Sequence, residues 1–293
     1  MSRFRFIAAE KANVSVVRLC RVLGVSLSGF YAWRQRQPSR HARIDAVLSE
    51  RIRDVHTNSH CTYGAPRIHA ELRASGTRVG RKRVARLMRV AGLAGRCPKR
   101  FRRTTIPADR PTAEPPDLVH RDFQPSAPDR LWVSDITYVR TWEGWLYLAV
   151  ILDAFSRRVV GWALADHLRT ELATDALQMA LTTRRPLQGL IHHSDRGGQY
   201  LSATYIAQLA EHGLVSSVGR PGTCWDNAVP ESFFATLKTE LLHRAAWPTR
   251  QHARTAIFQY LEGFYNRQRR HSRLGFRSPV DFEADYRAAT LAA

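Results

Sequence analysis

Seven of the 14 prolines lie between residues 95 and 128, and this stretch limits the possible folds of the 293-residue chain more than any other. Proline donates no backbone hydrogen bond and disfavours a helical conformation in the residue before it. Helix or sheet therefore cannot continue through such a segment. Residues 95–128 are predicted to be an extended, basic linker between a first region, residues 1–94, and a second, residues 129–293.

The positive charge of the chain is concentrated on one side of this linker. Residues 1–110 contain 25 Lys and Arg against 6 Asp and Glu, whereas residues 111–293 contain 20 against 19. A strongly basic region joined to a nearly neutral domain is typical of proteins that bind nucleic acid. An unusually soluble surface is the alternative interpretation.

Composition excludes several other classes of protein. The longest strongly apolar run, Trp145–Leu152, is too short for a membrane helix, and no secretory signal is visible at the N-terminus. The four cysteines are far apart, which favours reduced thiols in a cytoplasmic protein. His56 and His60 have zinc-ligand spacing, but no closely spaced pair of cysteines follows them.

The first region is predicted to be all-helical and to include a helix-turn-helix. One helix ends at Gly24, and Ser26 can cap the next. A second helical pair follows, with Pro66 in the first turn of one helix. The other helix, between Gly80 and Gly92, carries five basic residues that we expect to contact DNA, with a solvated face as the alternative: Arg81, Lys82, Arg83, Arg86 and Arg89.

The second region has the alternating pattern of an α/β domain. Segments rich in β-branched and aromatic residues predict strands, and segments with helical periodicity predict helices between them. Strands are expected over residues 131–139, 146–152, 158–164, 190–194 and 215–218, and helices over 171–183, 203–211 and from 230 to about 243. Three hairpin-connected strands followed by alternating helices and strands predict a mixed sheet covered by helices.

Three carboxylates occupy unusual positions on this framework. Asp135 lies in the middle of a strand, Asp195 follows the end of another, and Glu231 is in the first turn of a helix after Pro230. If they converge, they would repel one another unless cations bind, and Mg²⁺ prefers oxygen ligands of this kind. Two such ions can support phosphoryl transfer. Each carboxylate taken alone could equally be a turn or capping residue.

Several neighbouring residues are further candidates. Lys238 falls on the same side of its helix as Glu231, about 10 Å further along at ~1.5 Å per residue, where it could contact DNA phosphate. Asp153 is interpreted as a turn-forming side chain. His192 and His193 could orient Asp195 or contact DNA, although packed strand-end histidines are the more natural interpretation.

Five motifs follow one another along the chain: Leu131-Trp-Val-Ser-Asp135-Ile-Thr-Tyr, Leu152-Asp-Ala-Phe-Ser-Arg-Arg-Val-Val-Gly-Trp162, His193-Ser-Asp195-Arg-Gly-Gly-Gln-Tyr200, Trp225-Asp-Asn-Ala-Val-Pro-Glu231-Ser-Phe-Phe-Ala-Thr-Leu-Lys238 and Tyr265-Asn-Arg-Gln-Arg-Arg-His-Ser-Arg-Leu-Gly275. In this order they closely resemble the IS-three family of bacterial insertion-sequence transposases. The similarity covers nearly the whole chain. Ser134 stands where threonine is expected.

The resemblance implies a ribonuclease-H-like catalytic core similar to that of retroviral integrases. It implies that Asp135, Asp195 and Glu231, with 35 residues between the last two, form an Asp-Asp-Glu triad that holds two Mg²⁺ or Mn²⁺ ions. The implied activity is cleavage at the ends of an insertion sequence and strand transfer into target DNA. A DNA-end-binding regulator and a general ribonuclease-H-like nuclease remain alternatives.

The resemblance also implies partners. These are the terminal inverted repeats, the target DNA, further copies of the chain on DNA, and the upstream-frame product that supplies a helix-turn-helix and leucine zipper. The chain resembles the second-frame product, and it contains no sustained heptad repeat. A basic patch near the C-terminus, which includes Arg269, Arg270 and Arg273, is expected to contact DNA; a solvated run is its alternative.

Overall fold

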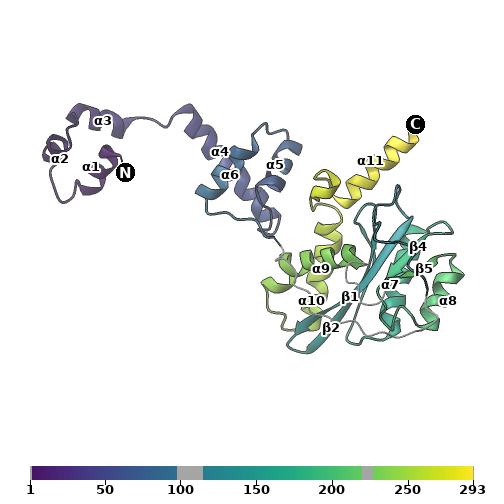
Figure 1. Cartoon of the computed structure of the whole chain (residues 1–293). Helices are drawn as coiled ribbons and strands as arrows, with labels where there is room; N and C mark the ends of the chain where they lie inside the picture. The colour runs from purple at the N-terminus through teal and green to yellow at the C-terminus, as the bar shows by residue number, and fades with distance from the viewer. Residues whose placement is uncertain (1, 98–114, 220–226, 293) are drawn as a thin grey trace. The chain divides into compact units, whose positions relative to one another are not determined.

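The computed structural model describes residues 2–97, 115–219 and 227–292 (Figure 1). The chain divides into two compact units, residues 1–53 and residues 54–293. The linker that composition predicts, residues 95–128, falls within the second unit, and its segment 98–114 lies outside the described residues. The predicted helical region, residues 1–94, therefore contributes to both units.

The first unit is helical, and its core is formed by Ile7, Leu19, Cys20 and Phe30. The predicted cap is confirmed, because Ser26 Oγ accepts a hydrogen bond from the backbone nitrogen of Gly29 at 3.0 Å. Gly24, with φ +61°, makes the turn before it. The helices are α1 (Arg3–Glu10), α2 (Val16–Val22), α3 (Leu27–Gln35) and the first part of α4 (Arg40–Asn58).

Within the described residues, no single helix has the length and apolar character needed to cross a membrane. One pair of helices bent by 113°, Val16–Val22 with Leu27–Asn58, passes the test of length and composition only when taken together.

The second unit begins with the rest of α4 and the predicted helical pair. Pro66 lies in the first turn of α5 (Ala65–Ala74), as expected. The basic helix is α6 (Arg81–Val90), which buries Val84, Leu87 and Met88 and turns its basic residues outward.

A five-stranded mixed sheet forms the centre of this unit, in the order β3-β2-β1-β4-β5. Its first three strands are antiparallel neighbours, and β4 and β5 join them in parallel. The predicted strands and fold class are confirmed, with boundaries that shift by a few residues. The strands are β1 (Leu131–Thr141), β2 (Gly144–Asp153), β3 (Val159–Ala165), β4 (Ile191–Ser194) and β5 (Val215–Val218).

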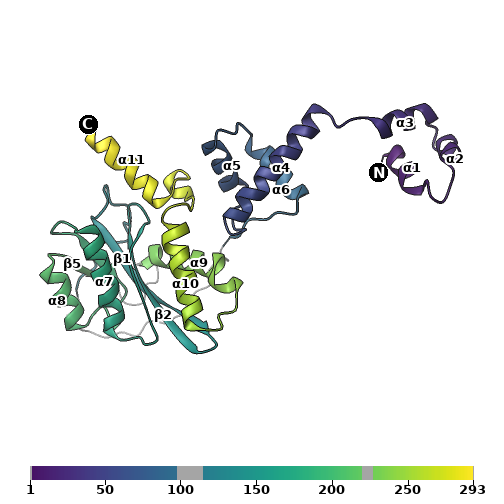
Figure 2. The same cartoon turned by 180° about the vertical axis from the view of Figure 1, so that it is seen from behind.

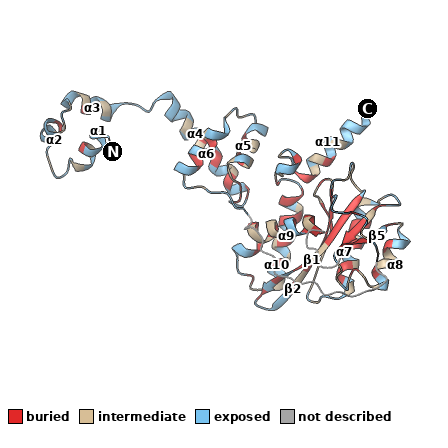
Figure 3. Ribbon diagram, viewed as in Figure 1, coloured by how far each residue is buried: buried red, intermediate tan, exposed pale blue. Residues whose placement is uncertain are grey.

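Helices α7 (Thr170–Arg184) and α8 (Ala203–Glu211) cover one face of the sheet (Figure 2). The main core lies between them and the strands, and Trp132, Ile151 and Leu177 are buried there (Figure 3). Gly161 on β3 permits close packing, since a Cβ at this position would lie 2.2 Å from the carbonyl oxygen of Ala176 on α7.

The C-terminal part of the chain follows α9 (Ala228–Glu240). The prediction of a helix in this segment is confirmed. From the sequence a basic helical tail is expected at the C-terminal end of residues 129–293, without individual elements. The elements that follow α9 include a π-helix with buried aromatic residues. These elements are η2 (Leu242–Arg244), α10 (Arg250–Phe258), the π-helix η3 (Gln259–Tyr265), η4 (Ser272–Leu274) and α11 (Pro279–Leu291).

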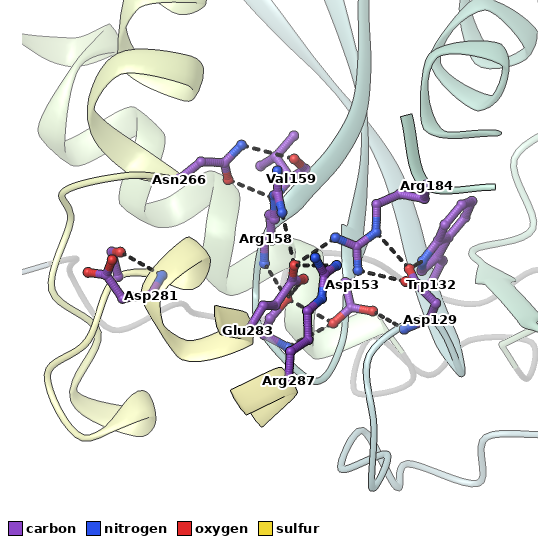
Figure 4. Close-up of polar contacts among 12 residues, drawn as sticks. Asp129, Trp132, Asp153, Arg158, Val159, Arg184, Asn266, Asp281, Glu283 and Arg287 are labelled. Carbon is purple, nitrogen blue, oxygen red and sulfur yellow. Dashed lines mark hydrogen bonds and ion pairs between the residues drawn. The ribbon is translucent and has the colours of Figure 1, made fainter. Parts of the chain in front are cut away.

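A buried ion-pair network attaches α11 to the sheet (Figure 4). Glu283 accepts hydrogen bonds from Arg184 at 2.7 Å and Arg158 at 2.9 Å, and Arg184 also donates to Asp129 at 2.7 Å. Only 2% of the Glu283 side chain is exposed. A charge this deeply buried depends on its partners, so the network holds α11 in place at Glu283.

Asp153 closes the turn after β2, as predicted. Its carboxylate accepts hydrogen bonds from the backbone nitrogens of Asp129 at 2.7 Å and Ser156 at 2.8 Å. Burial raises the pKa of Asp153 from 3.8 to about 6, against the effect of these hydrogen bonds and with a further contribution from the charge of Glu283.

This raised pKa predicts a pH-dependent stability. The folded state holds the Asp153 proton more tightly than the unfolded chain, so its contribution to the free energy of unfolding is full below about pH 4 and is lost as the pH rises to about 6. Urea unfolding of the wild type and of Asp153→Asn should diverge by about 2–3 kcal/mol over this range. A difference that is constant with pH would contradict the prediction.

Candidate active site

The register of two parallel strands places Asp135 and Asp195 level with each other. Val133 on β1 pairs with His193 on β4, and each aspartate lies two residues further along its chain. Neighbouring strands lie about 4.8 Å apart, and residues two apart point to the same face. The two carboxylates therefore start from adjacent backbone positions at one edge of the sheet.

Helix α9 brings Glu231 to the same edge. Glu231 is in the first turn of α9, where the helix dipole favours a negative charge. Asn227, which precedes the helix, donates from Nδ2 to the carbonyl oxygen of Ser134 at 3.3 Å. The start of α9 is thus tied to the residue immediately before Asp135.

The pKa of Asp135 reflects the proximity of the other two carboxylates. Its pKa is raised to about 8, mainly by burial of the carboxyl group and then by the negative charge of Asp195, with a smaller effect from Glu231. The hydrogen bond from the backbone nitrogen of Ile136, at 2.7 Å, and the charge of Lys238 act in the opposite direction. Burial also raises the pKa values of Asp195 and Glu231. Such repulsion is relieved when a cation binds between the carboxylates.

As the side chains stand, no group of three or more His, Cys, Asp or Glu residues within the described part of the chain is close enough to hold a metal ion. Asp195 Oδ1 instead accepts a hydrogen bond from the backbone nitrogen of Gly197 at 2.9 Å. The carboxylates supply the oxygen donors that Mg²⁺ prefers, and they come from elements whose backbones are already adjacent.

The two histidines before Asp195 are packed inside the sheet region. His192 Nε2 lies 3.0 Å from the hydroxyl of Tyr205, and His193 Nδ1 lies 2.9 Å from Ser217 Oγ. Both histidines are buried, which agrees with the packed-histidine interpretation. His56, of the possible zinc pair, has its Nδ1 3.2 Å from the carbonyl oxygen of Tyr63.

Lys238 lies two turns along α9 from Glu231. Its Nζ is 5.8 Å from the centre of the Tyr138 ring, a cation–π arrangement at the outer end of β1. Lys238 also lines a cavity of about 470 Å³ beside the exposed rings of Trp142 and Trp145. The sequence analysis did not single out these two tryptophans. They flank the hairpin turn between β1 and β2, and such large apolar side chains are seldom exposed.

The predicted DNA-contacting residues occupy different environments. On α6, Arg81, Lys82, Arg86 and Arg89 are exposed and Arg83 is half-buried. Arg273 is exposed as well.

Two other residues of the C-terminal patch are held by acidic partners that the sequence reading missed. Arg269 is 4% exposed and donates two hydrogen bonds to Glu240 at 2.7 and 2.8 Å. Arg270 pairs with Glu71. A contact of either arginine with DNA stays a prediction.

Comparisons with known proteins identify the domains and the family of the chain. Residues 125–224 match a family model described as an integrase core domain, and residues 212–279 match a second model with the same description. Residues 43–101 match an HTH-like domain. The chain is 43% identical over 284 residues to transposase InsF for insertion sequence IS3A of Escherichia coli (strain K12), covering 96% of this chain and 98% of the relative. The chain belongs to the IS-three family of insertion-sequence transposases.

A second relative also comes from an insertion element. A 31 kDa protein of insertion element IS600 from Shigella sonnei is 44% identical over 268 residues, covering 92% of this chain and 98% of the relative. The predicted family and fold class are therefore confirmed. The HTH-like match coincides with α4, α5 and α6, not with the α2–α3 pair that the sequence reading emphasised first.

Among solved structures, a simian T-cell lymphotropic virus intasome in complex with PP2A regulatory subunit B56 gamma has a TM-score of 0.47 and 14% identity. That match covers 78% of this chain and 73% of the viral chain. The HTLV-2 integrase catalytic core domain in complex with magnesium has a TM-score of 0.42 and 16% identity, covering 55% and 99% of the two chains.

Proposed function

We propose that this chain is a DNA transposase that cuts at the ends of an insertion sequence and joins them to target DNA. The observation that supports it most is the level placement of Asp135 and Asp195 on adjacent parallel strands, beside the first turn of α9 that carries Glu231. Membership of the IS-three family, together with an integrase core, supports the same reaction class.

The three carboxylates would hold two Mg²⁺ or Mn²⁺ ions. The raised pKa of Asp135 supports this assignment, because a buried carboxylate beside two others is stabilised in its charged form by a bound cation. When bound, such ions lower the pKa of water and stabilise negative charge on phosphate oxygens. Because bound ions would activate the water themselves, no histidine base is required, and His192 and His193 keep their contacts with Tyr205 and Ser217.

The reaction would proceed in two substitutions at phosphorus. In the first, water attacks a phosphodiester at the element end, the bond to the 3′ oxygen breaks, and a free 3′-hydroxyl is produced. In the second, that hydroxyl attacks a phosphodiester of the target, and the target's own 3′ oxygen leaves. Each step exchanges one phosphorus–oxygen bond for another, so no protein–DNA bond and no ATP are needed. Lys238 would hold a phosphate near the reacting strand.

The remaining assignments concern partners. The HTH-like segment, with the exposed cations of α6, would bind the terminal inverted repeats, and Arg273 would contact either donor or target strand. Several copies of the chain would bridge two ends. The upstream-frame product would supply a further helix-turn-helix and leucine zipper, as a fusion or as a partner.

A cleavage assay on labelled DNA tests this function. The substrate carries the sequences that flank the reading frame, and matched DNA with scrambled ends serves as control. We expect cutting at the element ends that requires Mg²⁺ or Mn²⁺, followed by joining to a plasmid. Binding in a gel shift without any cutting, with or without the upstream-frame product, would favour a regulator. Cutting without preference for the ends would favour a general nuclease.

A further inference from the structure

A second cavity, of about 460 Å³, lies against α9 and is lined by cationic side chains. Helix α9 contributes Ser232 and Thr236 to its wall, whereas neither Glu231 nor Lys238 lines it. The cavity therefore occupies a different flank of the helix from the carboxylate site. Its cationic lining includes Arg67, Arg121, Arg157 and Arg273.

The charge of this cavity is strongly one-sided. Arg269 and His271 also line it, and none of the lining residues within the described part of the chain is Asp or Glu. Glu240 lies outside the lining and is engaged by Arg269 at 2.7 Å and by Arg67 at 3.4 Å. The negative charge of Asp153 also acts on Arg157, with a smaller effect than that of Arg273. Burial, followed by the positive charge of Arg273, lowers the pKa of Arg157 to about 10. Burial and the surrounding arginines lower the pKa of His271 as well. A bound anion would relieve this repulsion.

The backbone of Arg157 adopts a conformation that glycine would adopt more easily. Arg157 has φ +62°, in the left-handed region where glycine is favoured and other residues are strained. The turn is held by main-chain groups, because the nitrogen of Arg157 donates to the carbonyl oxygen of Asp153 at 2.8 Å. The hydroxyl of Tyr265 donates to the carbonyl oxygen of Arg157 at 3.2 Å. A glycine would make both bonds without strain.

Within the described part of the chain, the guanidinium of Arg157, which is half-buried, makes one long hydrogen bond. Its Nη2 lies 3.4 Å from the carbonyl oxygen of Phe123, at the long end of hydrogen bonding. A planar guanidinium, an exposed Arg273 and the two hydroxyls of α9 form a set of donors that suits a tetrahedral phosphate.

We infer that this cavity binds a phosphate of the DNA backbone that does not itself react. Ser232 directly follows Glu231 in α9, so the cavity and the carboxylate site lie on neighbouring flanks of the same helix. Phosphate contacts of this kind set the position and register of DNA without reading its sequence. The inference rests on the proposed function, because that function is the reason to expect DNA rather than a free anion in this cavity.

A pair of matched substitutions tests the site. Arg157→Gly removes the charge at a left-handed position, and Arg185→Gly does the same at φ +48° on the exposed end of α7, outside the cavity. Both variants should be at least as thermally stable as the wild type, because glycine relieves the backbone strain. In EDTA, Arg157→Gly should bind a fluorescent DNA duplex roughly tenfold more weakly, whereas Arg185→Gly stays close to wild type.

The dependence of binding on salt gives a second readout. Loss of one phosphate contact should reduce the slope of log affinity against log salt concentration by about 0.9 in Arg157→Gly, and not in Arg185→Gly. Arg273→Gln, on an exposed residue of the same cavity, should reproduce both changes if Arg157→Gly does not fold. Equal affinities and slopes for the cavity variants and Arg185→Gly would overturn the inference.

Inorganic phosphate distinguishes the two sources of the anion. A DNA-phosphate site should give weak protection by millimolar phosphate against thermal unfolding, and this protection should be lost in Arg157→Gly. Phosphate could protect the wild type while the cavity variants bind DNA as tightly as the wild type does. That result would assign the cavity to a free anion and overturn its role in DNA binding. Because these measurements use EDTA, they stay informative even if the chain cuts no DNA, which would refute only the proposed function.

Discussion

Replacing Asp195 with Asn is expected to abolish both DNA cleavage and strand transfer while leaving DNA binding close to that of the wild type. The side chain keeps its size and the oxygen that accepts from the nitrogen of Gly197 at 2.9 Å, so the turn after β4 is preserved. The lost charge removes one donor to the proposed cations, an effect of several kcal/mol, or at least a thousandfold in rate. End-labelled DNA in a cleavage assay and a gel shift measure the two activities.

Asp175→Asn is the matched control. Asp175 is exposed on α7 and its replacement makes the same change of charge and of side-chain chemistry. It should cut and bind like the wild type. Loss of DNA binding in Asp195→Asn, with cleavage per bound complex retained, would refute the assignment of Asp195 to the reacting centre. A titration with Mg²⁺ followed by thermal unfolding adds a test without DNA, since only chains with the full carboxylate set should be stabilised.

A Glu283→Gln substitution should cause the largest loss of stability among the variants considered. Glu283 is buried and faces both Arg158 and Arg184, with the guanidinium of Arg184 at 2.7 Å. Neutralising it leaves these cations with too little compensating charge, and breaking a buried pair in this way costs about 3–5 kcal/mol. Urea and thermal unfolding of the whole chain should record the loss.

Asp285→Asn, on the same helix, separates this effect from a general weakening of α11. Asp285 pairs with Arg277 at 2.7 Å, but both side chains are 52% exposed, so the expected cost is about 0–1 kcal/mol. The double variant Arg158→Met/Glu283→Gln should recover part of the loss, because it removes a stranded cation whose acidic partner within the described residues is Glu283, whereas Arg184 still has Asp129. Equal losses in Glu283→Gln and Asp285→Asn would contradict the role assigned to the buried network.

Local sequence patterns predicted the helices and strands of the core well. Alternating β-branched residues identified β1, and Ser26 identified the start of α3, because strand periodicity and helix capping act over a few neighbouring residues. The individual C-terminal elements were not predicted, because they depend on contacts between residues that are far apart in the sequence. The π-helix η3 depends on the packing of Tyr260, Phe264 and Tyr265 against distant partners, which no short sequence window contains.

The sequence by itself determined the family, the mixed α/β core and the three carboxylates as candidates, since these depend on ordered motifs and local periodicity. Only the tertiary structure decided which cations are exposed and which are neutralised. Arg269 and Arg273 belong to one basic run, yet Glu240, 29 residues away from Arg269, engages the first and leaves the second exposed. Pairing across the fold depends on three-dimensional distance, and a linear pattern of charges does not contain that distance.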